Sequence, residues 1–167
     1  GLSGSDEIYG GIGNDTIEGG DGDDTLYGGD GKDNIKGGGG VDTIYGGDGD
    51  DTITAGLGSY TFDDDDESGL QLVDAGDGDD YIEGRDNQKI IAGSGNDTIY
   101  GSFSYLDAGD GDDTVTIPMN AGESGRGGYN SWKVDHLDGG AGNDTITVSS
   151  MFGGGNHGST YWGDKIV

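Results

Sequence analysis

The chain has 167 residues, of which only 29% are hydrophobic and 41 are glycine, and its formal net charge is −27. So low a hydrophobicity with so high a charge is typical of a chain that stays disordered in plain water, so folding requires a counter-charge. The acidity argues against nucleic acid and anionic membranes as partners. The chain has no run of 18 apolar residues, the length needed to span a bilayer. The lack of cysteine excludes disulfides and thiolate metal sites.

Residues 1–54 consist of six contiguous nonapeptides that begin at Gly1, Gly10, Gly19, Gly28, Gly37 and Gly46. Every copy has glycine at positions 1 and 4, aspartate at position 6 and Ile or Leu at position 8. Because glycine tolerates positive φ, positions 1–6 predict a tight turn, and the β-prone positions 7–9 predict a short strand. Two units make one coil, so residues 18 apart should stack about 4.8 Å from each other in parallel sheets, with position 8 pointing inward.

Beyond residue 54 the nonapeptide returns at residues 75–83, 92–100, 108–116 and 139–147. The starts of the first three of these copies are separated by 17 and 16 residues, close to one coil, so the loops should stack on one side, here called side A. The aspartate row expected on side A is Asp15, Asp33, Asp51, Asp80, Asp97, Asp113 and Asp144. The opposite side, side B, is expected to keep only Asp6, Asp24 and Asp42.

These patterns predict an all-β fold, a right-handed parallel β-roll that forms a single domain over residues 1–167. Fifteen aliphatic side chains should point into the coil, seven in one sheet and eight in the other, and the last strand is expected at residues 165–167. In the sheet with eight such residues, the inward residues expected after the regular repeats include Val73, Ile90, Leu106 and Leu137. Side B is expected to carry insertions at about 55–72, 84–89, 101–105, 117–136 and 149–163.

The shared motif resembles the RTX (repeats-in-toxin) calcium-binding nonapeptide, GGxGxDxUx. The resemblance implies that calcium lies between consecutive turns of one side, held by the position-6 aspartates listed for sides A and B and by main-chain carbonyls. Such hard oxygen ligands suit Ca²⁺, which takes six to eight of them. The glycine-rich loops that would supply the carbonyls include Gly10, Gly19, Gly28, Gly37 and Gly46. Gaps between stacked loops predict about eight calcium ions, six on side A and two on side B.

The resemblance also implies a biological setting. Members of this family are secreted bacterial proteins, exported unfolded by type I secretion and folded by calcium outside the cell. The sequence is therefore expected to be an extracellular module, with neighbouring domains in a larger parent chain. Extracellular calcium modules commonly bind at about 10⁻⁴–10⁻³ M.

The side-B insertions differ in composition from the repeats and contain candidate ligand-binding residues: Arg126, Tyr129, Trp132, Lys133, His136 and Trp162. Loops gathered on one side of a rigid scaffold are common binding sites, so an extracellular polysaccharide or cell-surface glycan is a candidate partner. Two alternative roles stay open for these residues: the aromatic side chains pack the loops onto the coil, or they face a neighbouring domain.

Two rows of side chains should face outward. Tyr9, Tyr27 and Tyr45 recur at position 9 and predict a cross-strand aromatic row, with sugar binding as the alternative. Threonine recurs on the other sheet but is interrupted by Asn34 and Tyr81, which favours ordinary β-propensity over ice or carbohydrate binding. This second row consists of Thr16, Thr52, Thr98, Thr114 and Thr145.

No catalytic motif is present in the sequence, neither GxSxG nor HExxH nor a P-loop. Carboxylates are so abundant that a pair of them carries no information about acid–base catalysis. The sequence therefore predicts a calcium-binding module that is not an enzyme. The alternatives are a fragment of a polysaccharide-modifying β-helix enzyme of the lyase or epimerase type, and an adhesin or ice-binding segment.

Overall fold

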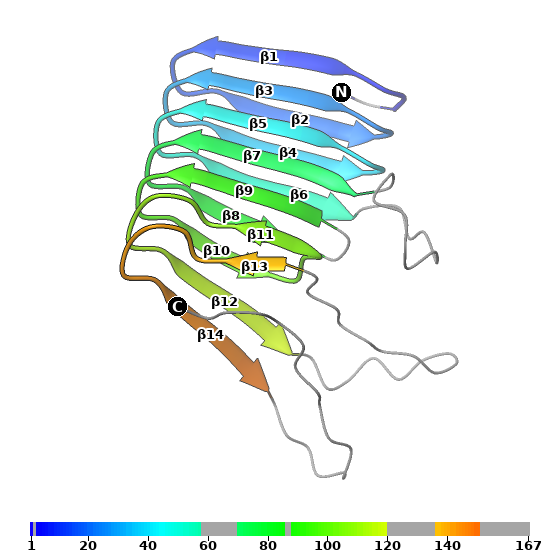
Figure 1. Ribbon diagram of the computed structural model, residues 1–167. Helices are drawn as coiled ribbons and strands as arrows, with labels where there is room; N and C mark the ends of the chain where they lie inside the picture. The colour runs from blue at the N-terminus through cyan, green and yellow to red at the C-terminus, as the bar shows by residue number, and fades with distance from the viewer. Residues whose placement is uncertain (2, 58–69, 86–87, 120–135, 151–167) are drawn as a thin grey trace, which may run out of the picture.

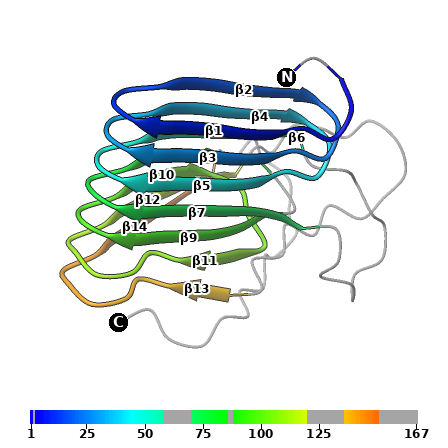
Figure 2. The ribbon, with the colours of Figure 1, turned by 90° about the horizontal axis from the view of Figure 1, so that it is seen from above.

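Each repeat contributes one strand to a coil made of two parallel sheets. The computed structural model describes residues 1, 3–57, 70–85, 88–119 and 136–150. Within these ranges all regular structure is β-strand, and successive strands alternate between two seven-stranded sheets. Figure 1 shows the strands stacked in two layers from β1 to β14, and Figure 2 shows the same layers from above.

The odd-numbered strands form sheet 1, in the order β1-β3-β5-β7-β9-β11-β13. Their bounds are β1 Glu7–Ile12, β3 Thr25–Asp30, β5 Thr43–Asp48, β7 Gln71–Asp77, β9 Gln88–Ser94, β11 Tyr105–Asp107 and β13 His136–Asp138. The even-numbered strands form sheet 2, in the order β14-β12-β10-β8-β6-β4-β2. Their bounds are β2 Thr16–Asp21, β4 Asn34–Gly39, β6 Thr52–Leu57, β8 Tyr81–Gly84, β10 Thr98–Gly101, β12 Thr114–Met119 and β14 Thr145–Ser150.

The register of both sheets follows position 8 of the repeat. Ile8 pairs with Leu26 in sheet 1, and the row continues from Ile44 to Val73 across the irregular segment between them. The described aliphatic residues of the two rows lie in one core cluster or pack against it, as the repeats predict, but the cluster also contains Phe103, Ile117 and four alanines that the repeats did not predict. Three row residues in terminal strands, Ile8, Leu137 and Ile146, are only partly buried, whereas Ile17 in the terminal strand β2 is buried. The strand expected at residues 165–167 lies outside the described residues.

The strands are longer than the sequence predicts, and the turns are shorter. In the regular repeats each strand covers positions 7–9 and continues through positions 1–3 of the next copy, so only positions 4–6 form the turn. The prediction that positions 1–6 form the turn is therefore wrong. The reason is that the glycine pairs of neighbouring coils lie in register, as Gly20 does with Gly38, and extend the main-chain ladder. The turn itself requires glycine at position 4, where Gly22 has a φ of 130° and Gly31 a φ of 137°.

The two edges of the coil differ in their connections. Side A holds the turns that lead from each odd-numbered strand to the next even-numbered one, such as β1 to β2 and β9 to β10. Side B holds the return connections, including those from β6 to β7 and from β12 to β13. Strands reach into all five of the predicted insertions; for example, β7 begins at Gln71, β9 begins at Gln88 and β12 continues to Met119. No membrane-spanning helix is found in the part of the chain that the structure describes.

Candidate metal centre

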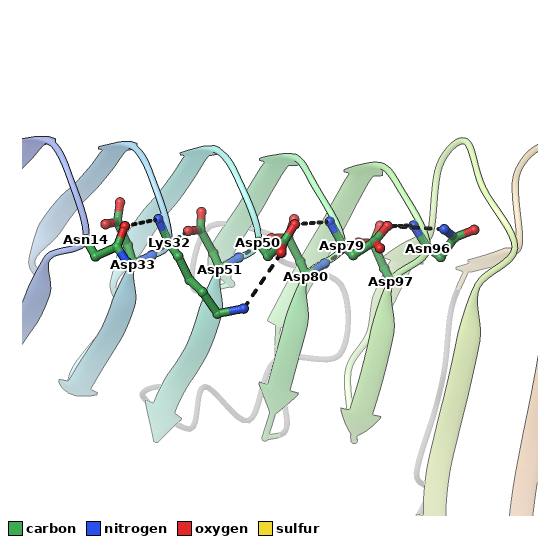
Figure 3. Close-up of polar contacts among 9 residues, drawn as sticks. All are labelled: Asn14, Lys32, Asp33, Asp50, Asp51, Asp79, Asp80, Asn96 and Asp97. Atoms are coloured by element: carbon green, nitrogen blue, oxygen red, sulfur yellow. Dashed lines mark hydrogen bonds and ion pairs between the residues drawn. The ribbon is translucent and has the colours of Figure 1, made fainter.

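The position-6 aspartates of side A form a continuous ladder. In each step the main-chain N–H of one aspartate donates to Oδ1 of the aspartate in the next coil, at 2.8 Å from Asp15 to Asp33 and 2.9 Å from Asp80 to Asp97. The same bond continues to the last step, from Asp113 to Asp144, at 3.1 Å. Figure 3 shows the middle of this row. From Asp33 to Asp144, one oxygen of each carboxylate is thus held in place by the main-chain N–H of the preceding loop.

The second oxygen, Oδ2, is buried and has no hydrogen-bond partner in seven of the described aspartates: Asp15, Asp24, Asp33, Asp51, Asp80, Asp97 and Asp113. Six of them belong to side A and one, Asp24, to side B. Burial is the largest cause that raises the pKa of Asp80 to about 7 and that of Asp51 to about 6, and neighbouring carboxylates add to it. Because a buried, unpartnered carboxylate oxygen is energetically costly, these rows require either protons or cations.

In the loops whose position 1 is glycine, the unpartnered carboxylate oxygen lies close to a carbonyl oxygen of the neighbouring coil. A Cβ atom added to Gly10 would lie 2.8 Å from Asp15 Oδ2 and 2.5 Å from the carbonyl oxygen of Gly28, so both oxygens face one spot. Beside Gly19, Asp24 Oδ2 and the Gly37 carbonyl oxygen would each lie 2.5 Å from such an atom. Carboxylate and carbonyl oxygens that converge from two loops are the ligands that Ca²⁺ prefers.

The spot beside position 1 is not equally open in all loops. Ala75, Ala92 and Ala108 occupy position 1 in three later loops of side A, and their methyl groups are buried in the core cluster. Among the described residues, no three His, Asp or Glu side chains converge as they would in a conventional metal cluster. Any ion between the coils would therefore take many of its oxygens from the main chain.

On side B the ladder begins in the same way and then changes. The N–H of Asp6 donates to Asp24 Oδ1 at 2.8 Å, and the N–H of Asp24 donates to Asp42 Oδ1 at 3.1 Å. Because Thr43 pairs with Leu72, the residue one coil beyond Asp42 is Gln71. Gln71 pairs in turn with Gln88. Sequence reasoning missed both glutamines, although each stands two residues before a core residue of sheet 1, the place that aspartate has in the repeat.

A second, exposed ladder at position 5 was also missed. Asn14 Oδ1 accepts from the N–H of Lys32 at 3.0 Å, and Asp79 Oδ1 accepts from the N–H of Asn96 at 2.7 Å (Figure 3). The ammonium of Lys32 lies 3.8 Å from Asp50 Oδ2, with both side chains largely exposed. Such an exposed ion pair contributes little to stability.

The predicted outward rows lie where the repeat places them. The rings of Tyr9 and Tyr27 stack 4.6 Å apart and those of Tyr27 and Tyr45 stack 5.0 Å apart. The threonine row lies in register along sheet 2, as Thr98 does with Thr114. The aromatic row is thus confirmed as a cross-strand stack, and its contribution to sugar binding stays a prediction.

Of the candidate ligand-binding residues, only His136 is described. Its ring stacks on Tyr105 at 4.4 Å, and the ammonium of Lys89 lies 4.9 Å from the centre of the Tyr105 ring. These three side chains occupy position 7 of sheet 1, next to side B. The other candidates lie outside the described residues: Arg126, Tyr129, Trp132, Lys133 and Trp162.

Comparison with known families agrees with the repeat geometry. A family model described as the RTX calcium-binding nonapeptide repeat, HemolysinCabind, matches in 4 copies, at residues 1–35, 27–62, 84–115 and 131–149. Together these ranges cover more than half of the chain. The loop with Asp80 lies between two of the matched ranges, yet its hydrogen bonds are those of the other side-A loops. No curated protein and no solved structure matches the chain significantly.

Proposed function

The chain belongs to the RTX calcium-binding nonapeptide repeat family, and on this premise we propose that it is a non-catalytic module whose folding depends on calcium held between its coils. Calcium binding itself follows from the family. The observation that supports the dependence is the set of seven buried carboxylate oxygens without a hydrogen-bond partner. With a net charge of −27, a chain of this kind needs cations for folding, so binding and folding should be one event.

The proposed ligands are the position-6 carboxylates together with carbonyl oxygens of the glycine-rich loops. On side A they are Asp15, Asp33, Asp51, Asp80, Asp97, Asp113 and Asp144, and on side B they are Asp6, Asp24 and Asp42. The proposed carbonyl donors include the loops of Gly10, Gly19, Gly28, Gly37 and Gly46. One ion in each gap between neighbouring loops gives about eight, six on side A and two on side B. The support is strongest where position 1 is glycine, because there a carboxylate and a carbonyl oxygen face one spot and no methyl group occupies it.

We further propose that the module comes from a secreted bacterial protein. The physical argument is the calcium concentration: extracellular calcium modules bind at about 10⁻⁴–10⁻³ M, well above the cytosolic range of calcium buffers and sensors. A chain with such affinity would stay unfolded inside the cell and fold after export.

Equilibrium dialysis against calcium, with the bound metal counted by atomic emission, tests this function. At about 5 mM calcium, above the range of extracellular modules, we expect about eight ions per chain and a simultaneous gain of β-structure. Magnesium should not replace calcium, because it requires a stricter octahedral geometry and holds its water more firmly. A chain that binds no calcium at this concentration would contradict the proposal.

A second function, recognition of an extracellular polysaccharide by the side-B loops, is favoured by the stacked Tyr105 and His136 rings beside Lys89. The exposed His136 ring at the edge of this stack offers a surface for a sugar ring. We expect the wild-type module to bind an acidic or neutral glycan on an array and the double substitution Trp132→Ala and Trp162→Ala to abolish that binding. Binding that survives the double substitution would assign these aromatics to packing or to a domain interface.

A further inference from the structure

The Nε2 atom of Gln71 is surrounded by three oxygens. It lies 3.1 Å from Asp42 Oδ2, 3.1 Å from the carbonyl oxygen of Gly40 and 3.3 Å from the carbonyl oxygen of Ala55. The Gln71 side chain is fully buried, so water does not compete for these contacts. The oxygens come from two neighbouring coils, because Gly40 and Asp42 belong to one side-B loop and Ala55 lies in β6 of the next coil.

A similar set of oxygens is found at the neighbouring side-B loop, where no side-chain amide among the described residues is present to donate a hydrogen bond. At the preceding side-B loop, Asp24 Oδ2 and the Gly37 carbonyl oxygen face one spot beside Gly19, and Asp24 Oδ2 has no partner. One coil further, Asp42 Oδ2 and the Ala55 carbonyl oxygen face the corresponding spot beside Gly37. There the Gln71 amide supplies the donor, and Asp42 Oδ2 is satisfied although Asp42 is fully buried.

We propose that the carboxamide of Gln71 takes the place of a calcium ion between the Asp42 loop and the following coil, and so ends the ion row of side B. The inference rests on the calcium binding proposed above. A carboxamide can do this because it has two N–H donors, which three converging acceptors can share. Gln71 thus sets how many ions the chain binds.

Gln88 continues the row of hydrogen-bonded side-chain amides on side B by one more coil. Its Nε2 atom donates to Gln71 Oε1 at 2.7 Å and to the carbonyl oxygen of Gly56 at 3.3 Å. Its own Oε1 accepts from the main-chain N–H of Arg85 at 2.8 Å. Both glutamines are therefore held by hydrogen bonds at each end of the amide, and the donor of one is oriented by the acceptor of the other.

The change from aspartate to glutamine on side B occurs at Gln71 for a structural reason. The connection from β6 to β7 is the first on side B that departs from the nonapeptide. An ion in this gap would be held by oxygens that converge from the two neighbouring coils, and the Gln71 amide satisfies oxygens from the same two coils, those of Gly40, Asp42 and Ala55. Gln71 therefore allows side B to accept a longer connection without leaving the Asp42 carboxylate unpartnered.

The substitution Gln71→Asp tests the inference, because it restores the residue type that the repeat has at this position and removes the amide. We expect calcium-saturated Q71D to bind one ion per chain more than the wild type in equilibrium dialysis. The substitution Asn34→Asp is the matched control, since it makes the same change of charge at an exposed position on sheet 2 and should leave the number unchanged. An equal count in wild type and Q71D would overturn the inference, whereas a wild type that binds no calcium would overturn the proposed function instead.

A second measurement does not depend on a variant that folds. In the calcium-saturated wild type, the side-chain NH₂ of Gln71 should exchange with solvent at least about tenfold more slowly than that of Asn34, because it is buried and hydrogen-bonded. If calcium occupied this gap, the amide would be displaced. Exchange of the Gln71 NH₂ as fast as that of the exposed Asn34 would therefore overturn the inference.

Discussion

The two edges of the coil are made from the same repeat, but they differ in how they satisfy their buried oxygens. Side A keeps the aspartate loop from Asp15 to Asp144, and the described carboxylates in its interior each leave one oxygen without a partner. Side B keeps aspartate only as far as Asp42, after which the amides of Gln71 and Gln88 supply donors. The difference teaches that each gap between coils is decided separately: a gap whose carboxylate oxygen has no donor would need a cation, and a gap with a side-chain amide would not.

Asp80→Asn should cause a large loss of stability, because Asp80, like the other interior aspartates of side A, borders two gaps. Asparagine keeps the Oδ1 that accepts from Asp51 N–H at 2.7 Å but replaces the charged Oδ2 with an NH₂ group. With calcium at about 100 times its Kd, each lost ion lowers the free energy of unfolding by about 2.7 kcal/mol. Thermal unfolding and ion counting at fixed calcium measure the effect.

The neighbouring substitution Asp79→Asn is the control for this comparison. Asp79 is exposed and accepts only at Oδ1, from Asn96, so its replacement should change the free energy of unfolding by less than about 0.5 kcal/mol. If D79N and D80N lowered stability equally, the loss would reflect general charge and not an ion held by the inner row.

Ile35→Ala and Ile44→Ala should show that the difference between the edges does not extend into the core. Ile35 lies in sheet 2 and Ile44 in sheet 1, and both are fully buried. Each truncation should lower the free energy of unfolding by about 2–5 kcal/mol, with the two values within about 1 kcal/mol of each other. Chemical unfolding in calcium provides the values, and a much larger loss for one variant would place the asymmetry in the core as well.

The metal-free chain should be sensitive to pH. Burial raises the pKa of Asp97 on side A and of Asp42 on side B to about 6, and that of Asp80 to about 7, against about 3.9 in an unfolded chain. Since the folded form binds these protons more tightly, the free energy of unfolding is highest below about pH 4 and falls as the pH rises from about 4 to 7. Decalcified protein should therefore gain β-structure on acidification, as far-UV circular dichroism would record.

The affinity for calcium should depend on pH in the opposite direction to the stability of the metal-free fold. Protons and calcium compete for the same carboxylates, so calcium affinity should fall as the pH is lowered through the same window. Decalcified protein whose β-content stays constant or rises with pH would show that the buried carboxylates are not the groups that oppose folding.

Lys32→Ala should have the smallest effect. The lysine pairs with Asp50 across the outer, position-5 ladder of side A at 3.8 Å, in an exposed position, where an ion pair is worth about 0–1 kcal/mol. The Tm at saturating calcium should change little. A large drop would mean that the outer ladder, and not the inner aspartate row, holds side A together.

Much of the fold could be predicted because the repeat states it many times. Aspartate at position 6 and an aliphatic residue at position 8 fix both the row of carboxylates and the inward row, and four later copies recover the register after it breaks. The strand length was wrong because a Gly-Gly pair has no strand propensity of its own and becomes extended only when the next coil pairs with it, as Gly29 does with Gly47.

The replacement of aspartate by glutamine in the side-B row could not be predicted in the same way. Gln71 lies in a segment without a recognisable loop, and its place in the aspartate row becomes evident only when Thr43 is paired with Leu72. Its amide then satisfies oxygens of residues 16 and 31 positions away in the sequence. A polar residue two places before an inward aliphatic one was the only available signal, and its meaning depended on contacts between coils.

Far-UV circular dichroism of the whole chain at neutral pH, before and after removal of calcium by EGTA, tests the central claim most directly. We expect the β-structure signal of the calcium-saturated chain to disappear with EGTA and to return when calcium is added back, while magnesium does not restore it. A spectrum that keeps its full β-content after exhaustive removal of calcium would contradict the account, because the buried carboxylates would then be compatible with the fold without a cation.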